Sequence, residues 1–199
     1  MNFKKIIITV LFMVLLTSLV HAQLFARSGF KGGVNFAKYT GSDVHDPETM
    51  IGYIIGGFVA FEINESFYIQ PEVFYTMKGV KFSGPGWEYS ENINYIEVPL
   101  LVKYVLSTYG NSNPYVLTGP AFGFNLGGTY DAESDDGDGS GDLDDIAPLD
   151  AGLVFAGGFD FGRIILEVRY TMGLSAIYDF DEDVDAKNAV LSIMAGFTL

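Results

Sequence analysis

Residues 163–174 read RIILEVRYTMGL, and this stretch decides the fold. Apolar and polar side chains alternate along it with a period of two, which is the spacing of a β-strand rather than of a helix. One face carries the charges of Glu167 and Arg169. The opposite face carries Ile164, Leu166, Val168, Tyr170 and Met172. The pattern predicts a strand with one face against apolar surroundings and the other against polar groups.

The same alternation recurs in segments of roughly ten residues separated by turn-forming residues. It predicts eight strands, at 29–37, 52–63, 67–78, 93–106, 114–126, 150–161, 163–176 and 188–199. The expected fold class is therefore all-β.

The predicted connections alternate between short and long. Tight turns fall at 64–66 and around Gly162, with a modest one at 107–113. Long polar connections fall at 38–51, 79–92, 127–149 and 177–187. Outer-membrane barrels have short periplasmic turns and longer extracellular loops. The chain is therefore predicted to be an eight-stranded antiparallel up-and-down transmembrane β-barrel with both ends in the periplasm.

Two further strands show the same pair of faces. In the fourth strand, Ile96, Val98, Leu100, Val102 and Tyr104 oppose Tyr95, Glu97, Pro99, Leu101 and Lys103. In the third, Phe67, Ile69, Val73, Tyr75 and Met77 oppose Tyr68, Gln70, Glu72, Thr76 and Lys78. A soluble sandwich would turn such an apolar face toward a core and the polar face toward water, so alternation alone leaves both arrangements open.

Aromatic side chains on the apolar face favour lipid outside. They fall near strand ends, as the two interfacial girdles of a membrane barrel do. The long-loop row consists of Phe36, Tyr53, Tyr75 and Phe124, and the short-turn row of Phe61, Phe67, Tyr104, Phe159 and Phe197.

The polar face carries equal numbers of opposite charges. The cations are Lys31, Lys78, Lys103 and Arg169, and the anions are Glu62, Glu72, Glu97 and Glu167. An eight-stranded barrel is just wide enough to be filled by side chains, and buried charges are costly unless paired. We expect a neutral network inside a closed lumen, with a solvated strand face as the alternative.

The first residues resemble a secretory signal. Lys4 and Lys5 precede an uncharged run over residues 6–20, and Ala22 ends a small-residue cleavage site. The pattern predicts a signal peptide at 1–22 and a barrel domain at 23–199 in the cell outer membrane. The alternative is an uncleaved anchor helix, although spanning a bilayer takes about 20 apolar residues.

Composition excludes several classes of protein. Loss of Lys4 and Lys5 would take the net charge from −14 to −16, which disfavours nucleic-acid binding. The hydrophobic content of 49% is too high for a disordered chain. The sequence has no cysteine, which excludes disulfides and thiolate metal sites. The acidity is concentrated in two long loops, at Asp131, Glu133, Asp135, Asp136, Asp138, Asp142, Asp144 and Asp145, and at Asp179, Asp181, Glu182, Asp183 and Asp185.

Three prolines fall inside predicted strands. Pro71, Pro99 and Pro120 each lack the backbone N–H that a β-ladder uses. We expect bulges or bends at these positions.

Several segments resemble the PorT-like outer-membrane β-barrel family, and together they span nearly all of the mature chain. They are Gly29-Phe30-Lys31-Gly32-Gly33-Val34-Asn35, Ile69-Gln70-Pro71-Glu72, Tyr95-Ile96-Glu97-Val98-Pro99-Leu100-Leu101, Gly119-Pro120 and Arg169-Tyr170-Thr171-Met172-Gly173-Leu174. The resemblance implies an eight-stranded barrel, and its eponymous member is linked to protein export through the outer membrane. Fold alone does not transfer that role.

The sequence contains three candidate sites. Asp136, Asp138, Ser140, Gly141, Asp142 and Asp144 match six positions of a calcium loop. Ala147 stands where a bidentate glutamate is needed, so a flexible acidic loop is favoured, with loose divalent-ion association as an intermediate case.

The second candidate is His45, which a carboxylate could orient as a general base. It lies between Asp43 and Asp46, with Ser42 nearby, but no nucleophile spacing accompanies it.

The third candidate consists of the glycine pairs Gly32-Gly33, Gly56-Gly57 and Gly157-Gly158. None of them opens a helix, so close strand packing explains them better than phosphate binding. We therefore assign no catalytic, cofactor-binding or metal-binding residue.

The function predicted from the sequence is a non-enzymatic outer-membrane barrel with a closed lumen and acidic extracellular loops, serving adhesion, assembly or secretion. Its expected partners are outer-membrane lipid and proteins that meet the loops or periplasmic turns, and not nucleic acid. The alternatives are a soluble lipocalin-like barrel that binds an apolar ligand and, less favoured, an enzyme active at the barrel rim.

Overall fold

The computed structural model describes residues 25–106, 112–135, 137–144, 146–178 and 185–199. Its strands are β1 (Phe25–Thr40), β2 (Met50–Glu62), β3 (Phe67–Gly84), β4 (Trp87–Val105), β5 (Ser112–Ser134), β6 (Gly139–Asp142), β7 (Leu149–Phe161), β8 (Ile164–Gly173) and β9 (Lys187–Thr198). Within these residues, the structure has no helix with the length and hydropathy needed to cross a bilayer.

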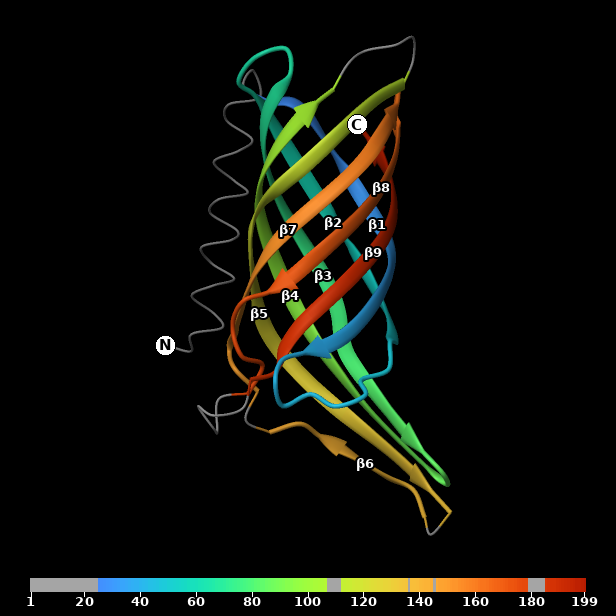
Figure 1. Cartoon of the computed structure of the whole chain (residues 1–199). Coiled ribbons are helices and arrows are strands. Elements are labelled where there is room, and N and C mark those ends of the chain that lie inside the picture. The colour runs from blue at the N-terminus through green and yellow to red at the C-terminus, as the bar shows by residue number, and fades with distance from the viewer. Residues whose placement is uncertain (1–24, 107–111, 136, 145, 179–184) are drawn as a thin grey trace.

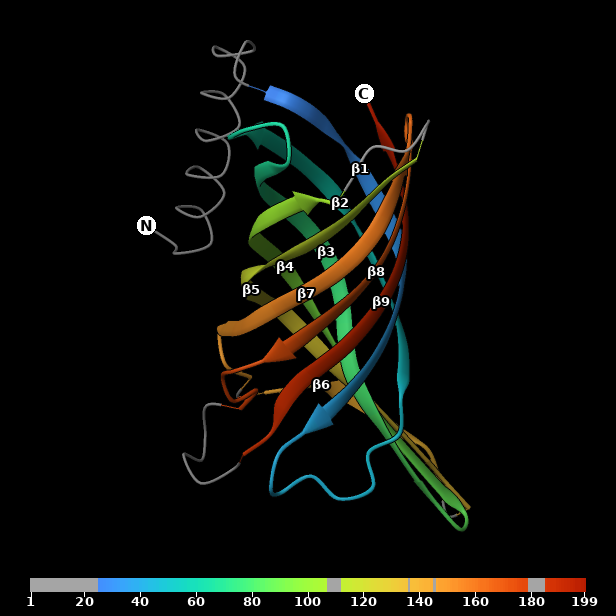
Figure 2. The same cartoon turned by 45° about the horizontal axis from the view of Figure 1, so that its top comes forward.

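Eight of the strands close into a barrel (Figures 1 and 2). Antiparallel pairs run in the order β4-β3-β2-β1-β9-β8-β7-β5, and a β4–β5 pairing completes the ring. The first and last barrel strands, β1 and β9, lie side by side through twelve residue pairs, from Gly29–Thr198 to Thr40–Lys187. The predicted eight-stranded antiparallel barrel is confirmed.

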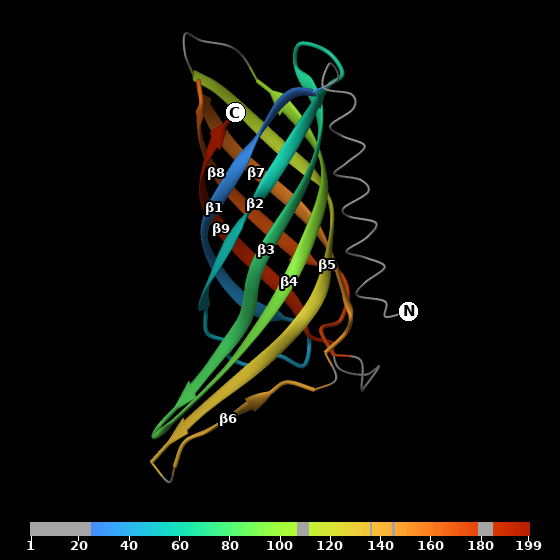
Figure 3. The same cartoon turned by 180° about the vertical axis from the view of Figure 1, so that it is seen from behind.

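The ninth strand, β6, lies outside the ring. It pairs with β5 alone among the described strands, through Thr129–Asp142 to Ala132–Gly139. Figure 3 shows β3, β4 and β5 running past one end of the barrel with β6 beside them.

The prediction of two of the long loops is partly wrong, because both segments contain residues that form strands. Residues 79–92 form an extended β3–β4 hairpin that continues to the Gly84–Trp87 pair, where Pro85 and Gly86 make the turn. Residues 127–149 contain the end of β5 and all of β6. Residues 107–111 of the predicted turn at 107–113 lie outside the described residues, and so do residues 179–184 of the fourth predicted long loop.

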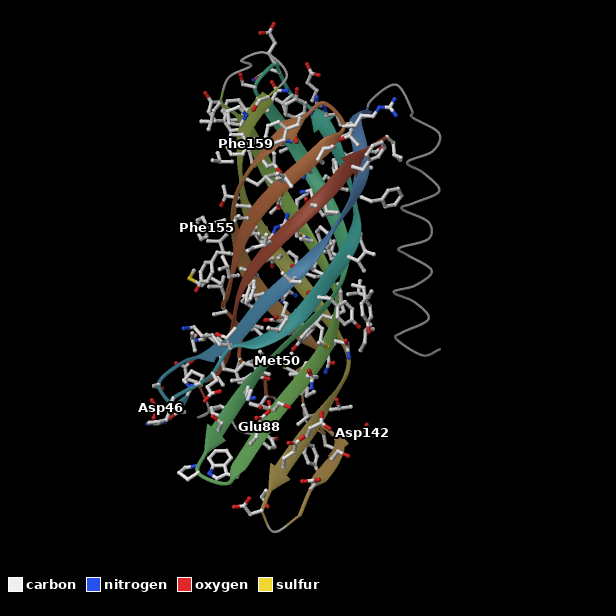
Figure 4. All side chains as sticks on the ribbon, turned by 90° about the vertical axis from the view of Figure 1, so that its right-hand side faces the viewer. Asp46, Met50, Glu88, Asp142, Phe155 and Phe159 are labelled. Carbon is white, nitrogen blue, oxygen red and sulfur yellow. The ribbon has the colours of Figure 1, made fainter. Side chains whose placement is uncertain are left out.

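The two strand faces lie as predicted. On β8, exposed and buried side chains alternate without interruption from Ile164 to Gly173. Figure 4 shows Phe155 and Phe159 on the outside of the wall. Neighbouring girdle aromatics pack together at both ends, with ring centroids 5.8 Å apart for Tyr53–Tyr75 and 4.7 Å apart for Phe67–Tyr104. Large apolar side chains are exposed on the outer wall of all the barrel strands, among them Val34, Ile55, Val102, Val116, Phe155, Val168 and Ile193, so the wall carries an apolar band.

The prolines interrupt ladders without shifting their register. Pairing of β2 with β3 is missing between Phe58–Glu72 and Phe61–Ile69, beside Pro71. Similar gaps lie beside Pro99 in the β3–β4 ladder and Pro120 in the β4–β5 ladder. The ladders are therefore interrupted at all three prolines, as expected, but the interruption is a gap in pairing rather than a shift of register; the β4–β5 register shifts at Asn94/Tyr95 instead.

One glycine of each pair has no room for a side chain. A Cβ at Gly33 would lie 2.0 Å from the Ile193 carbonyl oxygen, and one at Gly56 the same distance from that of Val73. At Gly158 it would meet the Tyr115 hydroxyl at 2.5 Å. Close packing inside the narrow barrel, as predicted, explains these glycines.

Candidate functional sites in the lumen and the projecting sheet

A ring of four charges lies at the centre of the lumen. Arg169 donates to Glu72 and to Glu167 at 2.6 Å each, and Lys31 donates to the same two carboxylates at 2.8 and 2.6 Å. Gln70 and Tyr115 supply further donors, at 2.7 Å to Glu72 and 2.9 Å to Glu167. All four carboxylate oxygens therefore accept hydrogen bonds, which offsets much of the cost of burying the charges.

Two smaller clusters lie on either side of this ring. Toward the long loops, Lys78 contacts Glu97 at 2.5 Å and Asp150 at 3.0 Å. Toward the short turns, Asp160 accepts from Arg27 at 2.7 Å and from Lys103 at 2.8 Å.

The network is neutral, as predicted, but its membership differs. It contains five cations and five carboxylates, namely Arg27, Lys31, Lys78, Lys103 and Arg169 with Glu72, Glu97, Asp150, Asp160 and Glu167. Glu62 was predicted wrongly, because it lies at the end of β2 and is exposed. Arg27, Asp150 and Asp160 were missed because they lie at the edges of the expected strands.

Each of the four deeply buried cations also lies over an aromatic ring. The distances from charge to ring centroid are 5.1 Å for Lys31–Phe58, 5.2 Å for Arg169–Phe74, 5.2 Å for Lys78–Tyr95 and 3.8 Å for Lys103–Tyr115. Cation–π contacts grow stronger when water is excluded. A cation paired with an aromatic ring thus occupies the lumen at four levels.

The described residues leave a cavity of about 150 Å³ at the short-turn end of the lumen. Its lining includes Arg27, Gln70, Lys103, Asn113 and Asp160. Gln70, Asn113 and Asp160 each carry a buried oxygen that accepts no hydrogen bond from the described residues. The lining of the cavity is mixed, because Phe58, Val105 and Ile165 lie beside these polar groups, and its volume is below the roughly 300–1,000 Å³ of a typical ligand pocket.

An apolar cluster closes the long-loop end. Its buried members are Tyr39, Val80, Ile93, Tyr95, Ile177 and Ala186, from β1, β3, β4 and the connection between β8 and β9. Two isolated backbone β-bridges connect this end of the barrel. One pairs Glu48 with Lys81 of β3, and the other pairs Ile146 with Tyr178. We call this cluster the cap.

A buried carboxylate holds the cap together. Glu91 is 6% exposed and accepts hydrogen bonds from Tyr39 at 2.9 Å, Tyr89 at 3.0 Å and Tyr178 at 2.5 Å. Burial, followed by the charge of Glu91, raises the pKa of Tyr39 and of Tyr89. Burial and the hydrogen bond to Glu91 raise the pKa of Tyr178. The three hydroxyls therefore stay protonated and continue to donate.

The strands that pass beyond the apolar band form what we call the projecting sheet, made of residues 80–91, 128–134 and 139–142. Its lumen-side face continues the cap and carries aromatic rings, with Tyr89 stacked on Tyr130 at 6.0 Å between centroids. At its tip Trp87, the single tryptophan of the sequence, is 47% exposed. Its outer face carries Lys81, Glu88, Asp131 and Glu133. Figure 4 shows Glu88 and Asp142 on this extension.

The calcium-loop pattern does not form a turning loop. Gly139–Asp142 is extended β6, and Asp136 and Asp145 lie outside the described residues. Nowhere in the described ranges do three or more candidate ligands converge on a metal position. The expectation of a flexible acidic loop is therefore wrong for residues 128–134 and 139–142, which are paired strand.

His45 lies in the exposed β1–β2 connection without a carboxylate to orient it among the described residues. Its Nδ1 is 3.2 Å from the backbone oxygen of Asp43. The Asp43 carboxylate instead accepts from Ser42 Oγ at 3.1 Å and from the Asp185 backbone N–H at 2.9 Å. The arrangement fastens two loops to each other.

Sequence reasoning missed the Glu91–tyrosine cluster. Residues 79–92 read as a polar loop, yet Val80 and Phe82 continue the inward period-two row of β3. The Gly84-Pro85-Gly86 sequence is also typical of a tight turn. These two signals together could have revealed the hairpin.

Comparisons with known proteins agree with this architecture. A family model described as outer membrane protein beta-barrel domain matches residues 21–179. No curated protein matches the chain closely enough to count as a relative.

The solved structures that are similar to the chain include Ail and Neisserial surface protein A. Ail, the attachment invasion locus protein of Yersinia pestis, is 14% identical, with 87% of this chain and 98% of that chain covered and a TM-score of 0.46. Neisserial surface protein A is 13% identical, with 86% and 97% covered and a TM-score of 0.48.

The family model spans most of the chain, and the closed ring with an apolar outer band is the architecture that it describes. The chain belongs to the outer membrane protein β-barrel domain family, and its location is the outer membrane.

Proposed function

We propose that this protein is a non-enzymatic, non-conducting outer-membrane component of a Gram-negative cell that presents the projecting sheet to a protein partner at the cell surface. The observation that carries this proposal is the ordered extension of β3, β4 and β5 beyond the apolar band, with Trp87 exposed at its tip. Because side chains fill most of the lumen, this extension is the feature of the described residues that we expect a partner to contact.

The orientation follows from the way outer-membrane barrels are built. Short turns belong to the periplasm and long connections to the cell surface, and a signal peptide at 1–22 would deliver the chain across the inner membrane. N-terminal sequencing of the mature protein should then begin at Gln23. A sequence that begins at Met1 would contradict the cleavage.

Cysteine labelling tests which end faces outward, because the natural sequence has no cysteine. Asp138 and Glu65 are both exposed, at opposite ends of the barrel. In intact cells, a membrane-impermeant maleimide should label Asp138→Cys and not Glu65→Cys. The reverse result would place the projecting sheet in the periplasm and overturn the proposal.

The charge of the sheet indicates the chemistry of the partner. Asp131 and Glu133 stand on its outer face, and Asp135 and Asp138 follow at the tip, all exposed. Complementary potentials steer association and exclude like-charged partners. The partner surface should therefore be cationic, with an apolar element for Trp87.

A surface of this kind is compatible with each of the three expected roles, which are adhesion, assembly and secretion. The resemblance to PorT-like barrels favours a secretion-associated role, in which the partner is another envelope protein. Crosslinking from Asp138→Cys in intact cells would identify it. Recovery of a partner from a different cell or surface would favour adhesion instead.

A binding measurement tests the recognition itself. Octalysine added to the purified barrel should change Trp87 fluorescence, with an affinity that falls as salt rises. Asp131→Asn with Glu133→Gln should weaken binding roughly five-fold. The matched control, Glu62→Gln with Glu65→Gln, removes two exposed charges at the other end and should have no effect. Equal losses in both variants would contradict recognition by the sheet.

The alternatives find less support. A lipocalin-like barrel needs an apolar interior, whereas this lumen is lined by ion pairs. A rim enzyme needs an oriented base, and His45 contacts a backbone oxygen. If His45→Ala abolished a hydrolase or acyltransferase activity of the purified protein, the non-enzymatic assignment would be wrong.

A further inference from the structure

The basic residues that do not line the lumen lie at the edges of the apolar band. Residues 25–199 contain nine lysines and arginines, and five of them belong to the lumenal network. The other four are Lys38, Lys81, Arg163 and Lys187. This distribution places Lys38, Lys187 and Arg163 at the ends of the apolar band, where we expect lipid headgroups, and Lys81 at the base of the projecting sheet.

Three of these four lie at the long-loop boundary. On β1, Lys38 is the first polar outward residue beyond Phe36. On β9, Lys187 comes after Leu191 and Ala189 in the direction of the long loops, and on β3, Lys81 follows Met77 and Gly79. Alternation keeps all three on the outer wall, since Val80 and Tyr39 beside them are buried inward.

Lys38 and Lys187 lie on neighbouring strands. In the β1–β9 ladder, Lys38 pairs with Ala189 and Thr40 pairs with Lys187. The two lysines are thus diagonal neighbours on one face, a relation that brings long side chains within reach of a common group. Lys81 extends the row to β3, where its backbone pairs with that of Glu48.

We propose that Lys38 and Lys187, flanked by Lys81, form a binding site for the phosphate-bearing headgroup of a membrane lipid on the outer wall of the β9-β1 seam. Lysine stems lie along apolar surface while their ammonium groups reach the headgroup layer. The wall directly below, at Phe36 and Leu191, is apolar and accommodates acyl chains.

Nearby carboxylates do not prevent this. Lys187 contacts Asp185 at 2.5 Å and Lys81 contacts Glu88 at 2.6 Å, and each of these side chains is about a third to a half exposed. Exposed ion pairs contribute little, so a phosphate can displace them. Lys38 is exposed and has no ion-pair partner in the described part of the chain, which makes it the anchor of the site.

The occupant is a lipid and not a free anion. The three lysines stand on an open wall, with no enclosed pocket of donors to hold a small ion. Affinity therefore needs a second contribution, which the acyl chains supply by packing on the apolar band. Lys38 and Lys187 belong to the lipid boundary and are independent of the partner proposed for the projecting sheet, whereas Lys81 lies at the base of that sheet.

Native mass spectrometry of the full mature barrel in detergent tests the site. The probes are phosphatidylglycerol and a diacyl glycolipid with an uncharged sugar headgroup. Each of Lys38→Gln and Lys187→Gln should weaken phosphatidylglycerol binding about five-fold, and the double variant more. Binding of the uncharged glycolipid should not change in any variant, which also shows that the barrel is folded.

Arg163→Gln is the matched control, because Arg163 is exposed at the short-turn boundary, where it lies over Phe197 at 5.8 Å. It removes the same charge and should leave phosphatidylglycerol binding within about two-fold of the wild type. An equal loss in this control, or no loss in the double variant, would overturn the site. Complete competition by a molar excess of inorganic phosphate would show an adventitious ion only.

Discussion

Arg169 illustrates how a single residue sets the structure of the lumen. It is 0% exposed and donates to both Glu72 and Glu167. Arg169→Met would leave two buried carboxylates with Lys31 as their one remaining cation. Breaking a buried ion network in this way costs about 3–5 kcal/mol. Urea unfolding, followed by the heat-dependent gel shift of the folded barrel, should show this loss.

Glu62→Gln is the control at the same scale, because this carboxylate was predicted inside the lumen and lies exposed at the end of β2. Its substitution should change the free energy of unfolding by less than about 0.5 kcal/mol. A loss comparable to that of Arg169→Met would mean that Glu62 belongs to the network after all.

Glu91 gives the cap a pH dependence. Burial and the carboxylate raise the pKa of Tyr39, Tyr89 and Tyr178. Because these values are raised above the ordinary value of about 10, their contribution to cap stability is complete below pH 10. It is lost as the pH rises further and the hydroxyls ionise.

Tyrosinate absorbance measures this directly. Glu91→Gln should move part of the titration back toward the ordinary tyrosine pKa, because the charge that opposes ionisation is gone. Burial, which is the largest cause, would remain and keep the shift partial. Superimposable titrations of the variant and the wild type would rule out Glu91 as the residue that holds the cap.

At the scale of strands, period-two alternation predicted every barrel strand because lipid outside and ion pairs inside impose opposite polarities on neighbouring residues. The prediction failed at 79–92 and 127–149 because the outer face is no longer apolar beyond the membrane. Charged residues such as Lys81 and Asp131 can therefore occupy the outer face of a strand there, although in the sequence they indicated a loop. Long-range partners such as Glu91 and Tyr178 depend on which loops fold over the lumen, which the local pattern does not contain.

The projecting sheet should lie outside the membrane, and Trp87 reports on it as the single tryptophan. In vesicles with brominated acyl chains, Trp87 fluorescence should be quenched by iodide from water and hardly by the lipid. Phe155, which is 48% exposed on the wall, provides the control. In a Trp87→Phe background, Phe155→Trp should show the opposite pattern. Strong quenching of Trp87 by lipid would mean that the sheet lies within the bilayer.

At the scale of the whole molecule, the barrel has two successive closures. The central ring fills the lumen between Lys31, Glu72, Glu167 and Arg169, and the cap covers the long-loop end. An eight-stranded barrel leaves only enough interior for side chains. Planar-bilayer recordings of the wild type should therefore show no porin-like conductance.

The two closures are separable by mutation. Glu91→Ala with Tyr178→Ala removes the acceptor of the cap and one of its three donors, but leaves every ion pair of the central ring in place. If the ring is the seal, this variant should expose cap residues to protease and still pass no current. Conductance in this variant would identify the cap as the seal, and the barrel would then be a gated channel rather than a closed scaffold.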